Sequence, residues 1–269
     1  MNFQLQILGT ASAMPFSDRN PSAQVLTVQG RLFLIDCGEG TQQQMRRMHL
    51  SFLKVEAIFI SHIHGDHLFG IFGFLSTMAM YGRTERLTIY APASFGPILK
   101  FFLSYFGEGV EYPIEHVPLK MKEPETIRES RNIRVSAFPL QHKIEAFGFR
   151  FDEKLTERQA EKHAPRSFAY CSDTVPFPEL AQWVSGVDVL YHEATYPAAL
   201  ADKAVKHFHS TTTDAAAGAK AAGAGRLLVG HVSSRITDFD AYIKECREIF
   251  PDTTLLSDGD VIDFPCRTI

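Results

Sequence analysis

The chain has 269 residues, of which 45% are hydrophobic, and a net charge of -4. It is long enough to bury a large core, and we expect a single domain over residues 1–269. The acidic balance excludes a protein that attracts nucleic acid over its whole surface, so a polyanionic partner would need a local basic cluster or bound metal ions. The four cysteines form no C-x-x-C pair, which predicts reduced, mostly buried thiols rather than a thiolate zinc site.

Two features predict a soluble, cytoplasmic protein that has no membrane partner. The apolar stretch 68–80 contains Gly70 and Gly73 and is too short to cross a bilayer. The first four residues, M-N-F-Q, lack the basic and apolar pattern of a secretory signal.

The first half of the chain begins with a predicted β-meander. Phe3, Leu5 and Ile7 alternate with polar residues as in a half-buried strand, and strands are predicted at 24–28 and 31–35. The expected elements that follow are a helix at 41–50, a strand at 55–60, a helix at 68–80, a strand at 87–90, a helix at 93–106, and strands at 112–117 and 133–138 around a charged loop or irregular hairpin at 120–132.

The second half repeats this alternation of strands and helices. Strands are predicted at 147–151, 168–171, 187–191, 226–229 and 261–264, and helices at 212–222 and 239–250. Two halves of similar size and content predict an α/β layered fold, with two sheets packed face to face and helices outside.

Residues 61–67 read S-H-I-H-G-D-H and place three imidazoles and one carboxylate on the turn between a strand and a helix. His62 and His64 would point the same way, whereas Asp66 and His67 would turn onto the start of the helix. Polar residues on a surface turn are the simpler explanation for any one of them, but four potential ligands together favour a site for two divalent ions.

Three later residues follow apolar strand runs, where further ligands are expected. They are His142, Asp173 and His231. Each alone is equally explained as a hydrogen-bonded turn residue. Together with the first cluster they complete a set of seven ligands.

The order and spacing of these seven residues resemble the metallo-β-lactamase superfamily, which implies an αββα sandwich that holds two metal ions. Further motifs resemble the ribonuclease Z family of tRNA 3′-processing endonucleases. They are L-G-T at 8–10, D-C-G-E-G-T-Q at 36–42, S-D-T at 172–174, H-E-A-T at 192–195, H-S-T at 209–211 and G-H-V-S-S-R at 230–235.

This resemblance implies two divalent ions, with zinc as the first choice and manganese or iron as alternatives. One ion would take His62, His64 and His142, the other Asp66, His67 and His231, and Asp173 would bridge them. A hydroxide shared by the ions would be the nucleophile, and Asp66, His209 and Glu193 are the predicted catalytic residues. His209 would protonate the leaving oxygen, and Glu193 would orient the His209 ring. Ser210 or Thr211 would cap the following helix. The alternative is that His209 and Glu193 form a purely structural pair.

Candidate substrate contacts are Arg19 and Asn20 in the loop 15–20, and Ser233 and Arg235 in the last motif. The chain departs from the family in two places. Ser17 replaces a lysine of the loop, and only 30 residues separate His142 from Asp173, too few for the arm that grips tRNA. Residues 152–167 carry four acids and four bases and have no net basic character.

Three functions remain open at this stage. The first is endonucleolytic cleavage at tRNA 3′ ends, the second is hydrolysis of small or cyclic phosphodiesters by an arm-less relative, and the third is a non-catalytic binding domain. The complete ligand set disfavours the third. Two basic clusters, Arg46-Arg47-His49 and Lys203-Lys206-His207, are either polyanion contacts or solvated helix faces. The resemblance also implies a homodimer.

Overall fold

The computed structural model describes residues 2–264 and 266–267, and its contacts divide the chain into two compact units. One unit, the N-terminal unit, comprises residues 2–120 and 257–262; the other, the C-terminal unit, comprises the described residues of 121–256 and 263–267. A single domain over 1–269 stays a prediction. Among the described residues, no helix is long and apolar enough to span a bilayer.

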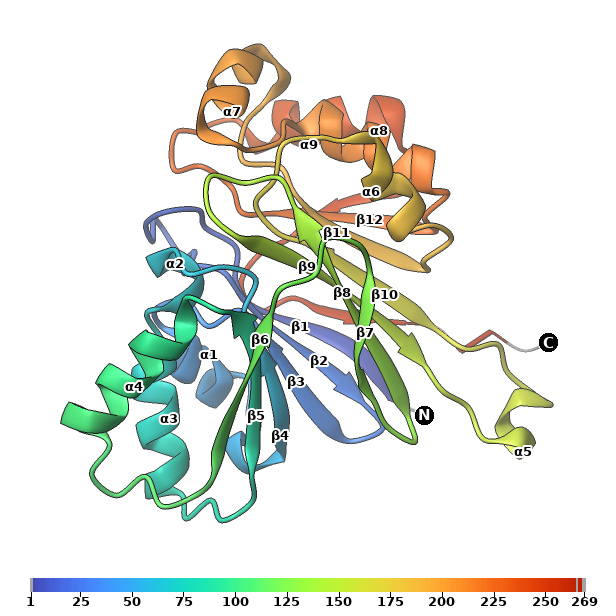
Figure 1. The fold of residues 1–269 in the computed structure, drawn as a ribbon. Coiled ribbons are helices and arrows are strands. Elements are labelled where there is room, and N and C mark those ends of the chain that lie inside the picture. Colours follow the sequence, from blue (N-terminus) through green and yellow to red (C-terminus); the bar gives the residue numbers. More distant parts are fainter. Residues whose placement is uncertain (1, 265, 268–269) are drawn as a thin grey trace. The chain divides into compact units, whose positions relative to one another are not determined.

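The N-terminal unit is built on a seven-stranded sheet with the order β14-β1-β2-β3-β4-β5-β6 in the described residues (Figure 1). Its strands are β1 (Phe3–Gly9), β2 (Ala23–Val28), β3 (Arg31–Ile35), β4 (Val55–Phe59), β5 (Leu87–Pro92), β6 (Ile114–Leu119) and β14 (Val261–Asp263). The first three strands pair antiparallel and form the predicted meander, whereas β3 to β6 pair in parallel. Consecutive parallel strands need crossover connections, which the helices of this unit supply.

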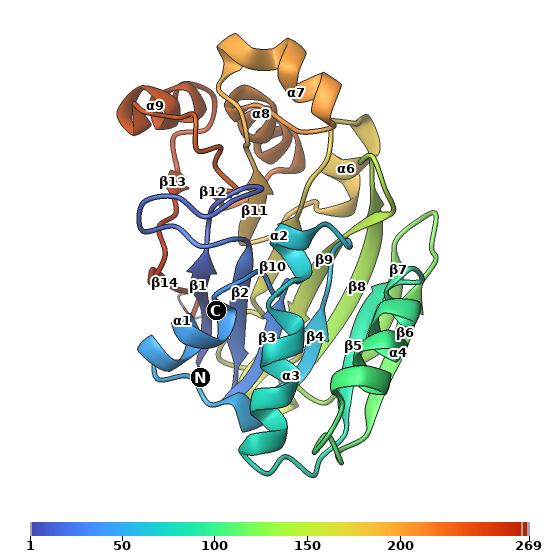
Figure 2. The same ribbon diagram turned by 90° about the vertical axis from the view of Figure 1, so that its left-hand side faces the viewer.

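The helices of this unit are α1 (Thr41–Arg47), α2 (Gly65–Leu68), α3 (Ile71–Met80) and α4 (Phe95–Phe106), with a 3-10 turn at Phe52–Lys54. Figure 2 shows α1, α3 and α4 along one side of the sheet. Met45, Phe74 and Phe102 bring these helices into one apolar core with the strands. The same core takes buried apolar residues from the neighbouring parallel strands β3, β4 and β5.

The C-terminal unit is built on a second seven-stranded sheet with the order β13-β12-β11-β10-β9-β8-β7, again counted over the described residues. Its strands are β7 (Glu125–Glu129), β8 (Ile133–Leu140), β9 (Ala146–Glu153), β10 (Ser167–Cys171), β11 (Val189–Glu193), β12 (Arg226–Gly230) and β13 (Thr253–Leu255). β7 to β10 pair antiparallel and β10 to β13 in parallel. The carboxyl ends of β10, β11 and β12 therefore lie at one edge of the sheet.

The helices of the C-terminal unit are α5 (Glu157–Ala160), α6 (Pro178–Trp183), α7 (Ala201–His207), α8 (Thr212–Ala222) and α9 (Phe239–Ile249), with a 3-10 turn at Ala198–Leu200. The small side chains Ala215, Ala219 and Ala222 let α8 pack closely in an apolar core with Leu180 of α6 and Cys246 of α9. Thr211 is the N-cap of α8, as predicted, and forms a capping box with Asp214.

Most predicted elements are confirmed, but several bounds were wrong. The helix expected at 41–50 ends at Arg47, and the helix expected at 68–80 is two helices. The helix is interrupted at Gly70, which packs against the backbone of the loop after β3. A Cβ on Gly70 would collide with the carbonyl oxygens of Gly38 and Cys37 in that loop. The charged stretch 120–132 contains β7, which pairs with β8 in an irregular hairpin.

Candidate metal centre and the residues around it

In the N-terminal unit, the H-I-H-G-D-H turn leads from β4 into α2, as the sequence predicts. His62 Nε2 and His64 Nδ1 lie 3.1 Å apart, and the two rings meet edge to face. Asp66 and His67 lie on α2, where His67 Nε2 is 3.7 Å from Asp66 Oδ2. The four predicted ligands of this unit thus form two adjacent pairs.

The same turn is fixed by the loop that follows β3. Asp36, fully buried, accepts hydrogen bonds from Ser61 N at 2.7 Å and Ser61 Oγ at 2.9 Å, and its Oδ2 lies 2.7 Å from His67 Nδ1. Ser61 Oγ is in turn 3.0 Å from His62 Nδ1. Asp36 therefore orients two imidazoles, His67 directly and His62 through Ser61, a role that its sequence motif does not reveal.

In the C-terminal unit, the three predicted ligands gather at the carboxyl edge of the sheet. Asp173 follows β10 and His231 follows β12, and His231 Nε2 lies 3.3 Å from Asp173 Oδ1. His142 Nε2 lies 3.9 Å from Asp173 Oδ2. Donor atoms of Asp173, His209 and His231 all lie within 4.8 Å of one another.

These imidazoles show one consistent hydrogen-bonding pattern. His142 Nδ1 donates to the carbonyl oxygen of Phe208 at 2.8 Å, and His231 Nδ1 lies 2.8 Å from Thr195 Oγ1. His67 is held through Nδ1 by Asp36 in the other unit. In each case the Nε2 atom faces a carboxylate. Holding Nδ1 fixes the tautomer and leaves Nε2 as the donor atom, which is how proteins prepare histidine to bind a metal.

The separations also suit metal ligation. Two ligand atoms that each lie about 2.0–2.2 Å from one tetrahedral ion are roughly 3.4 Å apart. The histidine–aspartate distances of 3.3 to 3.9 Å within the two units fall around this value. Imidazole and carboxylate form the ligand set of zinc and similar divalent ions. The residues present therefore fit divalent metal ions.

The H-E-A-T and H-S-T motifs meet beside these ligands. His209 Nδ1 is 3.1 Å from Glu193 Oε1, and Glu193 also accepts hydrogen bonds from Thr174 N and Ser210 N. Glu193 is buried at the end of β11. The predicted His209–Glu193 pair is thus formed, and its loops are tied together through the carboxylate.

Electrostatics keep the Glu193 carboxyl ionised. Burial alone would raise its pKa, but the charges of His209 and His231 and hydrogen bonds from His209 and Thr195 outweigh burial and lower the pKa to about 2. Thr195 Oγ1 donates to Glu193 Oε2 at 2.7 Å and lies 3.3 Å from His209 Nδ1. Thr195 links the carboxylate to two histidines, a role that the H-E-A-T motif alone does not reveal.

Four of the predicted ligands and their hydrogen-bond partners have a left-handed backbone that non-glycine residues seldom adopt. They are Ala13 at φ 55°, Asp36 at φ 54°, Phe208 at φ 60° and His231 at φ 57°. Each is a candidate ligand or the hydrogen-bond partner of one. Backbone strain of this kind costs about 1–3 kcal/mol per residue and is concentrated at functional sites. No feature of the sequence pattern marks these conformations in advance.

The predicted substrate contacts are held within their own units. Arg19 Nη1 donates to Thr10 Oγ1 at 2.6 Å, and Asn20 donates to Asp258 Oδ2 through N at 2.6 Å and Nδ2 at 2.9 Å. Ser233 Oγ lies 3.4 Å from Arg235 N. Arg19 and Asn20 therefore also brace the loop that carries them.

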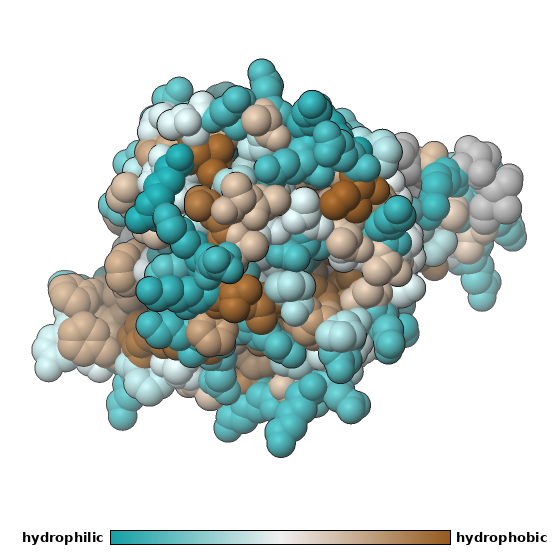
Figure 3. Space-filling view, turned by 90° about the horizontal axis from the view of Figure 1, so that it is seen from above, coloured by the Kyte–Doolittle hydropathy of each residue, from teal (hydrophilic) through white to brown (hydrophobic). Residues whose placement is uncertain are grey.

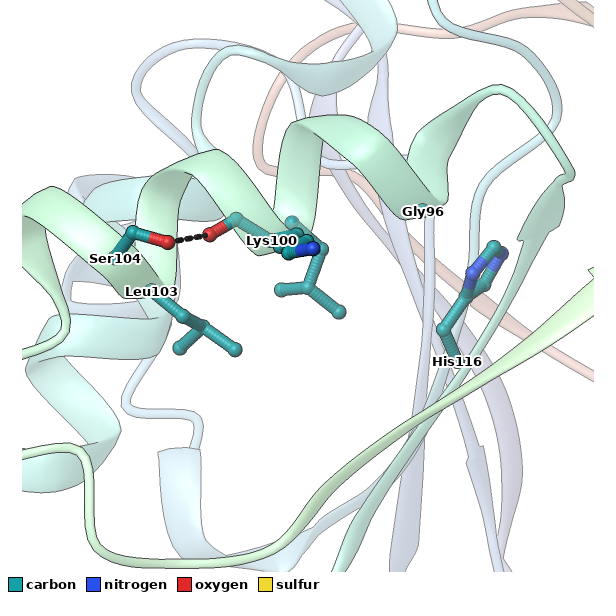
Figure 4. Close-up of a pocket in the computed structure, with 6 residues that line it drawn as sticks. Gly96, Lys100, Leu103, Ser104 and His116 are labelled. Atoms are coloured by element: carbon teal, nitrogen blue, oxygen red, sulfur yellow. Dashed lines mark hydrogen bonds between the residues drawn. The ribbon is translucent and has the colours of Figure 1, made fainter.

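Two surface cavities are formed by described residues other than the predicted ligands. One of about 410 Å³ lies between α4 and the edge strand β6, with Gly96, Leu103 and His116 among its lining residues (Figure 4). A second of about 480 Å³ in the C-terminal unit is lined by Gln141, Phe177 and Trp183 among others. No predicted ligand lines either cavity.

Comparison with known proteins identifies the family of this chain. Residues 31–232 match the family model described as "Beta-lactamase superfamily domain". A ribonuclease Z from Porphyromonas gingivalis is 35% identical over 300 aligned positions that cover 97% of this chain and 99% of the relative. The chain belongs to the ribonuclease Z family. A second member, from Azobacteroides pseudotrichonymphae, is 36% identical over 97% of this chain and 98% of its own length.

Solved structures agree with this family. The short form of human tRNase Z has a TM-score of 0.82 and 28% identity, and the match covers 97% of this chain and 99% of that one. The predicted fold class, the αββα sandwich of metallo-β-lactamases, is confirmed, and the chain is a metal-dependent hydrolase. At least 31 of the 300 positions aligned with the P. gingivalis relative have no residue in this 269-residue chain. The family member described here is thus shorter than that relative.

Proposed function

We propose that this protein is an endoribonuclease that cleaves precursor tRNA at the 3′ end of the mature sequence. The observation that carries the proposal is the His209–Glu193 pair, which lies in the same unit and at the same sheet edge as the donor atoms of Asp173 and His231. Membership of the ribonuclease Z family supports it.

We propose the seven predicted ligands as the residues that hold two divalent ions, zinc first and manganese or iron as alternatives. His62, His64 and His142 would serve one ion, Asp66, His67 and His231 the other, and Asp173 both. When bound, such ions lower the pKa of water and neutralise charge on a phosphodiester. The support is the Nδ1 bonding pattern of His67, His142 and His231.

His209 is proposed to give a proton to the 3′ oxygen as it leaves the phosphorus. Its Nδ1 is engaged by Glu193, so Nε2 is the atom that can carry the transferred proton. The pKa of the Glu193 carboxyl is lowered to about 2, and its carboxylate lies 3.1 Å from His209 Nδ1, where it can orient the ring. Asp66 is proposed to act beside the reacting phosphate, and its Oδ2 accepts a hydrogen bond from Ala13 N at 2.7 Å.

Arg19, Asn20, Ser233 and Arg235 are proposed as substrate contacts. Arg235 is a cation four residues after the predicted ligand His231, and Arg19 lies in the braced loop 15–20. Guanidinium groups bind phosphates through bidentate hydrogen bonds, which suits a tRNA substrate. A protein that processes precursor tRNA would act in the cytoplasm.

A homodimer is also proposed, on the strength of exposed apolar side chains on α4. Phe101, Tyr105 and Phe106 are 57%, 73% and 62% exposed and contact one another through their rings. Hydrophobic residues among hydrophilic ones are also seen on the surface in Figure 3. Contiguous apolar patches mark protein interfaces. Light scattering should give twice 30.2 kDa for the wild type and 30.2 kDa for a Phe101→Ser/Phe106→Ser variant.

The proposed activity is tested by supplying metal-loaded protein with precursor tRNA and with a small chromogenic phosphodiester. Cleavage of the precursor at the mature 3′ end supports the endoribonuclease, and His64→Ala should abolish it together with metal binding. A second candidate, hydrolysis of small or cyclic phosphodiesters, is favoured by the absence of at least 31 aligned positions found in a relative. Turnover of the small diester without any precursor cleavage would select that candidate.

A further inference from the structure

Helix α7, Ala201–His207, is the most exposed helix beside the proposed catalytic residues. Of its seven residues only Ala204 is buried, and Val205 is 64% exposed. A helix that is polar and exposed all round contributes little to a core. Contact with a binding partner explains the presence of α7 better than packing in the core does.

The cations of α7 lie on one face. Lys203, Lys206 and His207 follow the i, i+3, i+4 spacing that places side chains next to one another on a helix surface. All three are exposed. Asp202 is the acid of this helix and lies one turn before Lys206, so the face keeps a net positive charge.

The end of α7 leads directly to the proposed catalytic residues. Phe208 caps the helix with a left-handed backbone, and its carbonyl oxygen accepts the hydrogen bond from His142 Nδ1. Its side chain is 41% exposed. The rings of His207 and Tyr196 have centroids 6.4 Å apart, and those of Tyr196 and His209 6.0 Å apart. A basic helix face thus continues into aromatic rings that end at His209.

We propose that α7 and Phe208 form the RNA-gripping element of this enzyme, with Lys203 and Lys206 on phosphates and Phe208 stacked on an unpaired base next to the cleavage site. The inference rests on the proposed endoribonuclease function. The chain lacks at least 31 positions present in a longer relative, and residues 152–167 carry equal numbers of acids and bases. Affinity for RNA comes mainly from phosphate contacts, so another basic surface must supply them. Single-stranded RNA is bound by basic side chains interleaved with aromatic rings.

The phosphate contacts are tested by the salt dependence of kcat/KM on precursor tRNA. The test variant is Lys203→Gln/Lys206→Gln, and the matched control is Lys220→Gln/Lys244→Gln, whose lysines are exposed on α8 and α9 of the same unit. Loss of two contacts should reduce the slope of log kcat/KM against log salt by roughly 1.4 to 1.8 in magnitude. The control should keep the wild-type slope.

The stacking contact is tested by Phe208→Asn. Asparagine tolerates the left-handed backbone, so the carbonyl that holds His142 stays in place and metal content should equal that of the wild type. The KM for precursor tRNA should rise about 5- to 150-fold.

Equal salt slopes in the two double variants, or an unchanged KM in Phe208→Asn, would overturn this inference while leaving precursor cleavage intact. A wild-type protein that does not cleave the precursor would instead overturn the proposed function, and the inference with it.

Discussion

At the scale of single residues, the candidate metal centre contains groups that orient the proposed ligands as well as those ligands themselves. The proposed ligands could be named from the sequence because His142, Asp173 and His231 each follow an apolar strand run, and strand ends are visible in a sequence. Asp36, Thr195 and the Phe208 carbonyl were not predicted as partners of His67, His231 and His142. Two of those three partners have a left-handed backbone, a conformation that tertiary contacts impose and sequence pattern does not reveal.

The role of His209 predicts a dependence on the leaving group. His209→Ala should lower kcat on precursor tRNA by about 10²–10⁴-fold, because the alkoxide needs a proton, but change turnover of an aryl diester far less. Metal content should equal that of the wild type. Loss of metal would assign His209 as a ligand, which its position within 4.8 Å of the donor atoms of Asp173 and His231 also allows. Equal loss of turnover on both substrates would exclude the acid role.

Thr195 predicts a different effect. Its hydroxyl donates to Glu193 Oε2 and lies 2.8 Å from His231 Nδ1, so Thr195→Val removes the group that holds His231 without changing side-chain volume much. Metal affinity should fall about 10- to 100-fold, as measured by titration with a competing chelator. Thr195→Ser keeps the hydroxyl and should bind metal like the wild type. A Val variant with wild-type affinity would show that His231 needs no such partner.

At the scale of elements, close backbone approach fixes the metal-bearing turn. Cys37 N donates to the His67 carbonyl oxygen at 2.8 Å, and Gly70 N donates to the Cys37 carbonyl oxygen at 2.9 Å. A Cβ on Gly38 would lie 2.5 Å from the Asp66 carbonyl oxygen. The loop after β3 can approach α2 at Asp66, and the chain between α2 and α3 at Gly70, this closely only because Gly38 and Gly70 lack side chains.

These contacts predict that Gly38→Ala destabilises the protein by roughly 1–3 kcal/mol, since backbone atoms must move apart. Displacement of Asp66 should also weaken metal binding. Gly218→Ala is the matched control, because its Cβ would meet open space on α8, and a helical Gly→Ala change adds about 0.5–1 kcal/mol. Chemical denaturation of both variants measures the two effects. Equal stabilities would mean that the loop tolerates a wider spacing.

Helices and strands could be predicted where their buried face produces a periodic pattern of apolar residues in the sequence. Helix α8 was predicted with its observed bounds because Ala215, Ala216, Ala219 and Ala222 form a buried stripe above a capping threonine. Helix α7 was indicated only by its basic cluster, which can be a solvated helix face, and was given no bounds because it buries only Ala204 and so has no apolar period. Strand β13 is three residues long and pairs only at one edge of its sheet, too short for an alternating pattern.

At the scale of the whole molecule, the proposed ligand set takes residues from both units. His62, His64, Asp66 and His67 belong to the N-terminal unit, and His142, Asp173 and His231 to the C-terminal unit. The chain's alternation of strands and helices predicted two sheets, since each half contains enough strands for one. It did not predict that the C-terminal strand β14 pairs with β1 in the first sheet. A strand of three residues with one buried side chain has too short a pattern to indicate which strand it pairs with.

Metal removal should therefore lower the melting temperature of the entire chain. An ion that binds only folded protein and is present at 100 times its Kd stabilises that protein by about 2.7 kcal/mol. In a protein of this size each kcal/mol corresponds to about 2–4 °C, so chelation should lower Tm by roughly 5–10 °C per ion. Calorimetry of loaded, chelated and reloaded protein measures this, and reloading should restore the original value.

Variants from the two units sharpen this prediction, because His64 and His142 are proposed to serve the same ion. His64→Ala and His142→Ala should each remove most of the stabilisation by that ion, and the double variant should lose little more than either alone, since a shared ion can be lost only once. Calorimetry of the three variants with and without metal gives the comparison. Additive losses would mean that the two histidines serve separate ions, and the ligand assignment would have to be redrawn.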